Sequence, residues 1–379
     1  MPMLPQFRLE AFFATWEFKA RHHLTASDAE TLSISELLAF AGEDDRNRWE
    51  TLRFGYIDTR GTMELRDAVG STYSTIGPEN ILCFAGAEEG MYCAMHALLA
   101  PQDHAIVLVP NYQSMESIPQ SICAVTGVAL HEGDGWSLNA DDVLHAVRPN
   151  TRLVAVNFPN NPTGSIAPHS DFAELVALCA ERNIYLLSDE VYRGVERTPS
   201  KRLPQAADLY ERAFSLNAVS KAYGLPGLRV AWIASRDAAA LERMAEMKHY
   251  LSICNSAPSE VLATIALKAR EPLLARNSAL IAANIDLLTA FFDRYADFFQ
   301  WYEPDGGCVA FPRYLGKGNV EGFCRGLMES EGVLLLPGSI CQSALAAVSR
   351  DRFRIGFGRR GMEDALAAFA RYLDGHALF

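Results

Sequence analysis

The sequence predicts an α/β protein with two parts: a three-layer large domain built on a mostly parallel sheet, and a smaller α+β domain. Between residues 81 and 233, continuous apolar runs of strand length alternate with helical segments, which is typical of parallel strands covered on both faces. After residue 235 the pattern changes to long helices followed by short strand-like runs. We therefore assign residues 45–255 to the large domain, and residues 1–44 together with 256–379 to the small domain.

The expected elements follow in order, separated by polar or glycine-marked turns. Segment 53–73 predicts a turn and then an amphipathic helix, whose apolar stripe is Met63, Leu65, Ala68 and Val69. Segment 81–100 predicts a buried strand, a tight turn at Gly86 and a helix. The remaining strands of the large domain are expected within 104–112, 151–164, 184–192 and 214–233, and a helix at 171–183.

Composition excludes several classes of partner and compartment. The chain has 379 residues and a formal net charge of −12, which argues against nucleic acid or an anionic membrane as the main partner. No signal peptide and no apolar run long enough to span a membrane is recognisable, so we expect a cytoplasmic protein. The eight cysteines are scattered singly, which fits small thiols in a reducing compartment and gives no support to a zinc site.

Several polar residues follow the predicted parallel strands. In such sheets, ligands bind beyond the carboxyl ends of the strands, where the ends gather at one edge. The residues delivered to that edge are Gly86 with Ala87, Tyr112, Asn161, Asp189 and Lys221. This convergence is hard to obtain from a random surface and predicts the functional site.

The stretch FSLNAVSKAYGLPGLRVAW (214–232) is central to the prediction. Lys221 leaves the end of a buried strand, where its amine could act as a nucleophile. If it forms a Schiff base, an anionic cofactor must be held nearby, and Arg229 is the natural candidate for that task. The alternative is a solvated surface loop that happens to carry both side chains.

Asp189 and Arg354 are charged residues in apolar surroundings, so each needs a partner. Burial raises the pKa of Asp189, which stays ionised only beside a cation such as a protonated pyridine nitrogen. A plain N-cap or turn aspartate is the alternative. Arg354 requires an anion, either a substrate carboxylate or a structural Asp or Glu.

These motifs, in this order and over nearly the whole chain, resemble the class I/II aminotransferase family of fold-type I pyridoxal-phosphate enzymes, with its aspartate aminotransferase-like fold. The motifs that carry the resemblance are YIDTRGTMELRDAV, FAGAEEG, VPNY, NFPNNPTG, SDEVY, SKAYGLPGLRVAW, DGGCVAFPR and FRIGFG. Within the family, three stretches also look like capreomycidine synthase, namely SKAYGLPGLRVAW, the HYLSICNSAP region and GGCVAFPR.

The resemblance implies a role for each residue around the ring of pyridoxal 5'-phosphate. Lys221 would form the Schiff base and shuttle protons, and Asp189 would pair with the pyridinium nitrogen. Asn161 and Tyr192 would hold the ring hydroxyl, and Tyr112 would stack on the ring. Lys221, Asp189 and Tyr192 are accordingly the expected catalytic residues.

The resemblance also implies a phosphate site, a substrate site and a dimer. The expected phosphate-binding residues are Gly86, Ala87, Glu88, Ser220 and Arg229. Tyr56 would reach the phosphate of a neighbouring subunit, which implies a homodimer with shared active sites. Arg354 would bind the substrate α-carboxylate.

Two residues depart from the family pattern. Ala218 stands three positions before Lys221, where a hydroxyl residue is frequent, so one phosphate hydrogen bond is missing. Glu88 stands where a hydroxyl or amide residue is usual, and its carboxylate would repel a phosphate dianion. We expect the Glu88 side chain to turn away from the phosphate and only its N–H to serve.

The resulting hypothesis is an aminotransferase that moves an amino group between an α-amino acid and a 2-oxo acid. The alternative is a β-elimination lyase or cyclase of the capreomycidine synthase type, which would use the same lysine. A ligand-sensing regulator is disfavoured because no helix-turn-helix pattern precedes residue 53. A cofactor-free homologue is disfavoured because the lysine, the aspartate and both arginines occur together.

Overall fold

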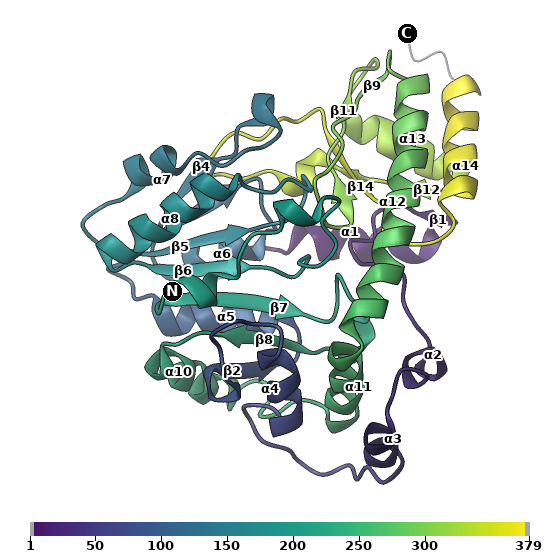
Figure 1. The fold of residues 1–379 in the computed structure, drawn as a ribbon. Coiled ribbons are helices and arrows are strands. Elements are labelled where there is room, and N and C mark those ends of the chain that lie inside the picture. Colours follow the sequence, from purple (N-terminus) through teal and green to yellow (C-terminus); the bar gives the residue numbers. More distant parts are fainter. Residues whose placement is uncertain (1–3, 376–379) are drawn as a thin grey trace.

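The computed structural model describes residues 4–375, which form a seven-stranded sheet flanked by helices and a second, smaller lobe (Figure 1). The strand order is β2-β8-β7-β6-β5-β3-β4. Strand β8 is antiparallel to both its neighbours, and all other pairs are parallel. The predicted mostly parallel sheet is therefore confirmed. Its strands are β2 (Ile81–Phe84), β3 (His104–Val109), β4 (Ala124–Ala129), β5 (Thr151–Asn157), β6 (Tyr185–Asp189), β7 (Ala213–Ala218) and β8 (Ala231–Ala234).

Helices cover both faces of this sheet. Along β5, Leu153 and Ala155 pack in one apolar cluster with helices α5 (Ala87–Leu98) and α10 (Ala238–Lys248). Val154 and Val156 face the other way, toward α8 (His169–Arg182). This alternation follows from the period of two along a strand and gives the three layers. The other helices around the sheet are α4 (Met63–Gly70), α6 (Ser114–Gln120), α7 (Ala140–Ala146), α9 (Ala206–Leu209) and α11 (Ala257–Lys268).

The smaller lobe is built around a long helix, α12 (Arg270–Arg294), which runs from the sheet side into the second lobe (Figure 1). Its strands pair as β10-β14-β13, β9-β11 and β1-β12, so the N-terminal strand joins the C-terminal part of the chain. The remaining helices are α1 (Arg8–Trp16), α2 (Ile34–Leu38), α3 (Glu43–Glu50), α13 (Val320–Glu331) and α14 (Met362–Gly375). The short strands are β1 (His22–His23), β9 (Phe299–Gln300), β10 (Val309–Ala310), β11 (Arg313–Tyr314), β12 (Val333–Leu334), β13 (Leu336–Pro337) and β14 (Phe353–Gly356).

The division into 45–255 and 1–44 with 256–379 stays a prediction, and residues 1–3 and 376–379 of the predicted small domain lie outside the described residues. One detail of the helix predicted within 53–73 is wrong. Leu65, Ala68 and Val69 are buried, whereas Met63 is 52% exposed because it is the first residue of α4 and precedes the buried stripe.

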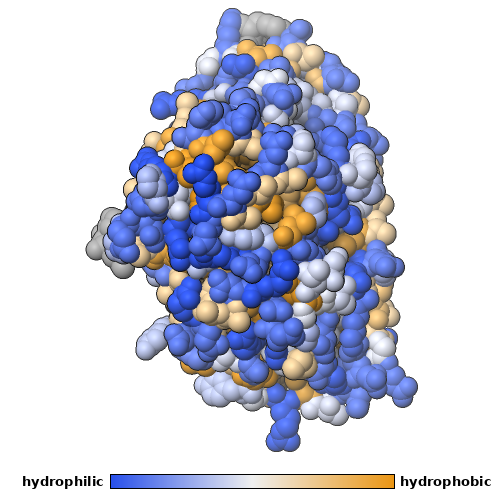
Figure 2. All heavy atoms as spheres, turned by 60° about the vertical axis from the view of Figure 1, so that its left-hand side comes forward, coloured by the Kyte–Doolittle hydropathy of each residue, from blue (hydrophilic) through white to orange (hydrophobic). Residues whose placement is uncertain are grey.

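Figure 2 shows one face of the molecule, which is mostly hydrophilic and carries some apolar patches. Among residues 4–375, no helix combines the length and the apolar character that crossing a bilayer requires. All eight cysteines are free thiols, and six of them are buried.

Candidate active site

A cavity of about 250 Å³ lies beyond the carboxyl ends of the parallel strands. It brings together nine of the predicted residues: Ala87, Glu88, Tyr112, Asn161, Asp189, Tyr192, Ser220, Lys221 and Arg229. Gly86 precedes one wall of this cavity, and Arg354 bonds to Asn161 at another. Tyr56 does not line the cavity, because its side chain is 89% exposed. The predicted gathering of strand ends is thus present in the fold.

Lys221 lies in the cavity rather than on a solvated loop. Its Nζ donates a hydrogen bond to Ser27 Oγ at 2.8 Å, and its carbonyl accepts from the N–H groups of Ala29 and Gly224. Burial lowers the pKa of Lys221, and the negative charge of Asp28 opposes part of this effect. A lowered pKa raises the fraction of neutral amine, which is the nucleophilic form.

The segment 24–30 lies against the loop that carries Lys221, and sequence reasoning did not find it. A Cβ on Gly224 would lie 2.5 Å from the carbonyl oxygen of Glu30, and one on Gly358 would lie 2.1 Å from that of Asp28. Glycine at these positions therefore lets the segment pass between the lysine loop and β14. Asp28 is held by Arg359 at 2.8 Å. The segment is irregular, so no periodic pattern could have placed it.

Asp189 ends β6 directly opposite Asn157 on β5. Its Oδ1 accepts a hydrogen bond from Val191 N–H at 3.2 Å, so it is a turn aspartate that also lines the cavity. Burial raises the pKa of Asp189 from 3.8 to about 7, although the positive charge of Lys221 lowers it. Asn157, which was not predicted, fixes both strand ends by donating to Asp189 O at 3.0 Å and accepting from Asn161 N at 2.8 Å.

Two buried polar groups beside the cavity lack a hydrogen-bond partner among residues 4–375. The Tyr192 hydroxyl is one, although the Ser27 hydroxyl is near enough to affect the pKa of Tyr192. The other is Nε of Arg354, whose remaining nitrogens donate to Asn161 Oδ1 at 3.0 Å and Thr25 O at 2.9 Å. The described residues offer Arg354 no carboxylate within 4 Å. Each such buried group requires an explanation, and a ligand in the adjoining cavity would give both groups a partner.

The start of α5 forms an anion site at the other end of the cavity. Helix N-termini present free N–H groups, and α5 begins at Ala87 immediately after Gly86. Gly86 has φ +106°, and a Cβ there would lie 2.4 Å from the Arg229 guanidinium. Glycine at this position thus allows the positive φ of the turn and leaves room for the Arg229 guanidinium. Ser220 is buried nearby, whereas Ala218 contributes only a methyl group.

The Glu88 side chain is held by Ser114, whose hydroxyl donates to the carboxylate at 3.0 Å. Burial raises the pKa of Glu88. Glu88 is among the residues that line the cavity, and the expectation that its side chain turns away from the phosphate stays a prediction.

Comparison with known proteins identifies the family of this chain. The model of the family "Aminotransferase class I and II" matches residues 42–370. The chain belongs to this family. Capreomycidine synthase of Streptomyces vinaceus is 29% identical to it over 99% of this chain and 95% of the relative. Aspartate aminotransferase of Thermotoga maritima is 30% identical over 75% of each chain. The crystal structure of a PLP-dependent aminotransferase from Streptococcus suis superposes with a TM-score of 0.91, 26% identity and 99% coverage of both chains.

The cofactor of this aminotransferase-family chain is pyridoxal phosphate, and the residues present fit it. A buried carboxylate with a pKa near neutrality, Asp189, suits a ring nitrogen that must be protonated. The unpartnered Tyr192 hydroxyl suits the ring oxygen, and the helix start with Arg229 suits the phosphate. Lys221 is the cavity's only lysine among the described lining residues.

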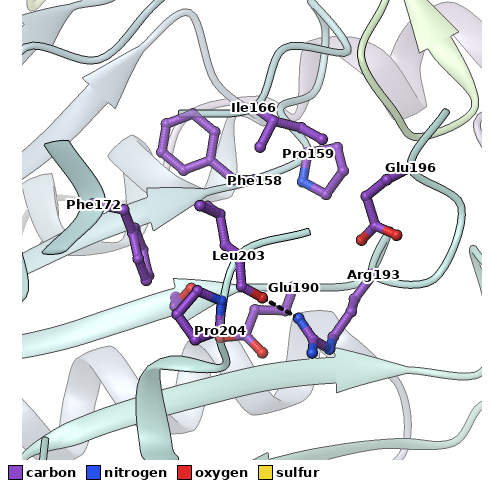
Figure 3. A pocket seen from close by; sticks show the side chains of 10 residues that line it. Phe158, Pro159, Ile166, Phe172, Glu190, Arg193, Glu196, Leu203 and Pro204 are labelled. Atoms are coloured by element: carbon purple, nitrogen blue, oxygen red, sulfur yellow. Dashed lines mark hydrogen bonds between the residues drawn. The ribbon is translucent and has the colours of Figure 1, made fainter. Parts of the chain in front are cut away.

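A second cavity, of about 10 Å³, is lined by Ser188 and Glu190, the two neighbours of Asp189 in the chain, and by eight further residues (Figure 3). Glu190 points into it, because neighbouring residues of an extended chain face opposite sides. Its Oε1 accepts hydrogen bonds from Ala206 N at 3.0 Å and from the Ser215 hydroxyl at 2.8 Å, and Arg193 lies beside it, bonded to the Leu203 carbonyl. This cavity has room for about one water, and the hydrogen bonds of Glu190 fix the chain directly after Asp189.

Replacing Glu190 with leucine is therefore expected to lower the free energy of unfolding by about 2–3 kcal/mol, since two buried donors lose their acceptor. Glu190→Gln keeps an accepting oxygen and should cost less than half as much. Urea denaturation of both variants measures the difference. Equal stability of Glu190→Leu and the unmodified protein would show that these hydrogen bonds contribute nothing.

Proposed function

We propose that this protein is an aminotransferase that moves an amino group between an α-amino acid and a 2-oxo acid. The observation that carries the proposal is the placement of Lys221 and Asp189 on one cavity with opposite perturbations, a lowered amine pKa and a raised carboxyl pKa. Such pairs are typical of acid–base sites. The cofactor, when bound, supplies a ring that withdraws electrons from the substrate Cα.

In this proposal each side chain has one task. Lys221 binds the cofactor and afterwards carries a proton to and from the substrate Cα, with Ser27 orienting its amine at 2.8 Å. Asp189 keeps the ring nitrogen protonated, and Tyr192 and Asn161 bond the ring oxygen. Tyr112 covers the ring. The N–H groups of Ala87 and Glu88, with Ser220 and Arg229, bind the phosphate next to the turn at Gly86.

Arg354 is proposed to bind the substrate α-carboxylate. Arg354 is 2% exposed, only two of its five N–H groups donate to described residues, and its Nε has no partner, so a carboxylate would accept hydrogen bonds from the unused donors. The neighbouring buried arginine, Arg352, already pairs with Glu132 and donates to Phe311 O at 2.7 Å. Arg352 therefore already has a carboxylate partner, whereas Arg354 has none among the described residues.

Replacing Arg354 with glutamine is expected to raise KM for the amino acid by about 100-fold, because a charge-assisted bidentate contact is lost. Arg352→Gln serves as the matched control and should lower the melting temperature while leaving KM within about threefold. Steady-state kinetics with thermal denaturation separates the two effects. An unchanged KM in Arg354→Gln would exclude this arginine from substrate binding.

We further propose a homodimer with shared active sites. Tyr56 is 89% exposed in its own subunit, and Phe54 and Tyr250 are each 91% exposed. Large aromatic side chains exposed to this degree are typical of interaction surfaces. In the proposed dimer, Tyr56 reaches the phosphate bound by the partner subunit.

A second candidate function is a β-elimination lyase or cyclase of the capreomycidine synthase type. The observation that favours it is the sequence similarity to capreomycidine synthase, which is 29% identical over 99% of this chain. Lys221 would have the same proton-transfer task, and the substrate would carry a leaving group on Cβ.

A substrate panel distinguishes the two functions. Purified enzyme is mixed with single α-amino acids and a 2-oxo acid, and the products are identified by mass spectrometry. A new amino acid paired with a new 2-oxo acid supports the aminotransferase. Ammonia release or a cyclised amino acid without any amino transfer would refute it and support the second candidate.

A further inference from the structure

Three arginine side chains converge on another cavity, of about 170 Å³, which the proposed function does not use. They are Arg193, Arg202 and Arg270. None of the residues that line this cavity, called the arginine cavity below, lines the active-site cavity. The chain as a whole has a formal net charge of −12, and cations at close range repel one another. An anion in the cavity would offset this repulsion.

Tyr223 shows that the three guanidinium groups lie near a common point. Burial raises the pKa of its hydroxyl to about 12, and the charges of Arg270, Arg193 and Arg202 all act in the opposite direction. The residue is 5% exposed and lines the arginine cavity, and its hydroxyl forms no hydrogen bond with any of residues 4–375. Buried tyrosine hydroxyls usually have a partner, and an acceptor in the cavity would supply one.

Within the described chain, two of the three arginines have no carboxylate partner. Arg202 Nε donates to Glu196 at 2.7 Å. The guanidinium groups of Arg193 and Arg270 donate to backbone carbonyls and, for Arg270, also to the Ser71 hydroxyl at 3.2 Å. Neither has a carboxylate oxygen of the described residues within 4 Å. Two positive charges at this cavity are therefore unpaired.

No acidic side chain of the described residues lines the arginine cavity. Glu190 lies beside Arg193, but it lines the small cavity of Figure 3, and the two side chains form no ion pair within 4 Å. Burial also raises the pKa of Glu190, which disfavours its charged form. The protein itself thus leaves the balancing charge to a ligand.

The other polar groups of the cavity fit a small ligand that accepts several hydrogen bonds. Asn217 is 6% exposed, and its amide oxygen already accepts from Ala218 N at 2.7 Å, which leaves its NH₂ group to donate. A phosphate dianion has two charges and several acceptor oxygens, and guanidinium groups bind phosphate in bidentate fashion. The cavity is smaller than the roughly 300–1,000 Å³ of pockets for drug-sized ligands. It therefore suits a small ion or one end of a small metabolite.

We propose that the arginine cavity binds a phosphate dianion, either inorganic phosphate or the phosphate group of a small monoester, at a site distinct from the phosphate site at the start of α5. Arg193 and Arg270 balance its two charges, and the Tyr223 hydroxyl donates to one of its oxygens. The site adjoins two segments of the active site, because Tyr223 follows Lys221 by two residues and Arg193 directly follows Tyr192. It does not depend on which reaction the enzyme performs.

Calorimetric titration of the holoenzyme with inorganic phosphate tests the site, because the cofactor already occupies the phosphate site beside Arg229. We expect one saturable binding event per chain, at least about tenfold tighter for phosphate than for acetate, which carries a single charge. Arg193→Gln and Arg270→Gln should each weaken phosphate binding at least about tenfold, and Tyr223→Phe about fivefold.

Glycerol 3-phosphate distinguishes the two sources of the phosphate group. Tighter binding of this monoester than of inorganic phosphate would assign the site to a metabolite, and weaker or equal binding would assign it to the free ion. In both cases the arginine substitutions should weaken binding.

Two control variants locate the binding. Arg182→Gln makes the same substitution on an exposed residue of α8 and should leave phosphate binding unchanged. Arg354→Gln should also leave it unchanged, which separates the arginine cavity from the proposed substrate site. Arg270→Gln and Tyr223→Phe keep the test decisive even if Arg193→Gln, which loses a buried hydrogen bond, fails to fold.

Three results would overturn the site. They are the absence of saturable phosphate binding to the unmodified holoenzyme, binding that survives unchanged in both Arg270→Gln and Tyr223→Phe, and binding that is lost in Arg354→Gln. Each of them would leave the proposed function intact.

Discussion

Replacing Lys221 with alanine is expected to abolish the covalent attachment of pyridoxal phosphate and to reduce turnover by about four orders of magnitude. In the proposed function, the variant loses both the amine that would bind the cofactor and the group that would move a proton at the substrate Cα. The cavity should persist, because Asp189 and Tyr192 are held by their own strand and turn. Borohydride reduction followed by peptide mass mapping measures the attachment, and product formation measures turnover.

A second buried lysine serves as an internal control for the first. Lys248 is 0% exposed, and its Nζ donates to Thr59 O, Cys83 O and Asn255 Oδ1 at 2.7–3.0 Å. These three bonds use all the donors of an ammonium group. The cofactor mass should therefore be found on the Lys221 peptide and never on the Lys248 peptide. Retention of a borohydride-stable adduct in Lys221→Ala would exclude Lys221 as the attachment site.

Replacing Asp189 with asparagine is expected to reduce turnover by about 10²–10³-fold while leaving Lys221 able to bind the cofactor. An amide cannot hold a proton on the ring nitrogen electrostatically as a carboxylate does, so the ring withdraws electrons less strongly. Rapid-mixing measurement of the first half-reaction isolates this effect from substrate affinity. Turnover within about threefold of the unmodified enzyme would show that Asp189 has no electrostatic role.

The same substitution has the opposite effect on stability when the cofactor is absent. Burial raises the folded-state pKa of Asp189 from 3.8 to about 7, so this group favours the folded state below pH 3.8 and loses that contribution as the pH rises through 7. The amide of the Asp189→Asn variant does not titrate. Without cofactor, the free energy of unfolding of this variant relative to that of the unmodified protein should therefore rise by about 2–4 kcal/mol as the pH is raised from 4 to 8. Urea denaturation at both pH values measures this. A pH-independent difference would contradict the buried, unpaired carboxylate.

Much of the site could be predicted from strand-end positions. Asp189 is the last residue of the buried strand β6, and Lys221 follows the buried strand β7 by three residues. Parallel strands bring such positions to one edge of the sheet. Ala87 and Glu88 were predictable for a similar reason, since a glycine turn between a strand and a helix exposes the first helical N–H groups.

The remaining parts of the site depend on contacts between segments far apart in sequence. Ser27 and Asp28 lie in an irregular segment that reaches Lys221 only because glycines at 224 and 358 leave room for it. Glu10, which also lines the active-site cavity, lies on a helix whose position is set by Gln113 and Tyr112. Neither helical nor strand periodicity carries information about such packing, so these residues emerge only from the folded chain.

The partner of Arg354 also could not be predicted from the sequence. Its apolar neighbours in sequence showed that the guanidinium would need a partner, but they could not show which one. The fold supplies Arg352 with Glu132 and leaves Arg354 with an unused N–H beside Asn161. The distinction between a structural and a ligand-binding arginine thus depends on tertiary contacts alone.

The most direct test of the central claim follows the substrate nitrogen. A ¹⁵N-labelled amino acid that reacts in the panel is incubated with catalytic enzyme and an unlabelled 2-oxo acid. The proposed function predicts that the label appears in the α-amino group of the amino acid formed from that 2-oxo acid, in amounts equal to the new 2-oxo acid. Label found instead in free ammonia, or retained in a cyclised product, would contradict the assignment as an aminotransferase.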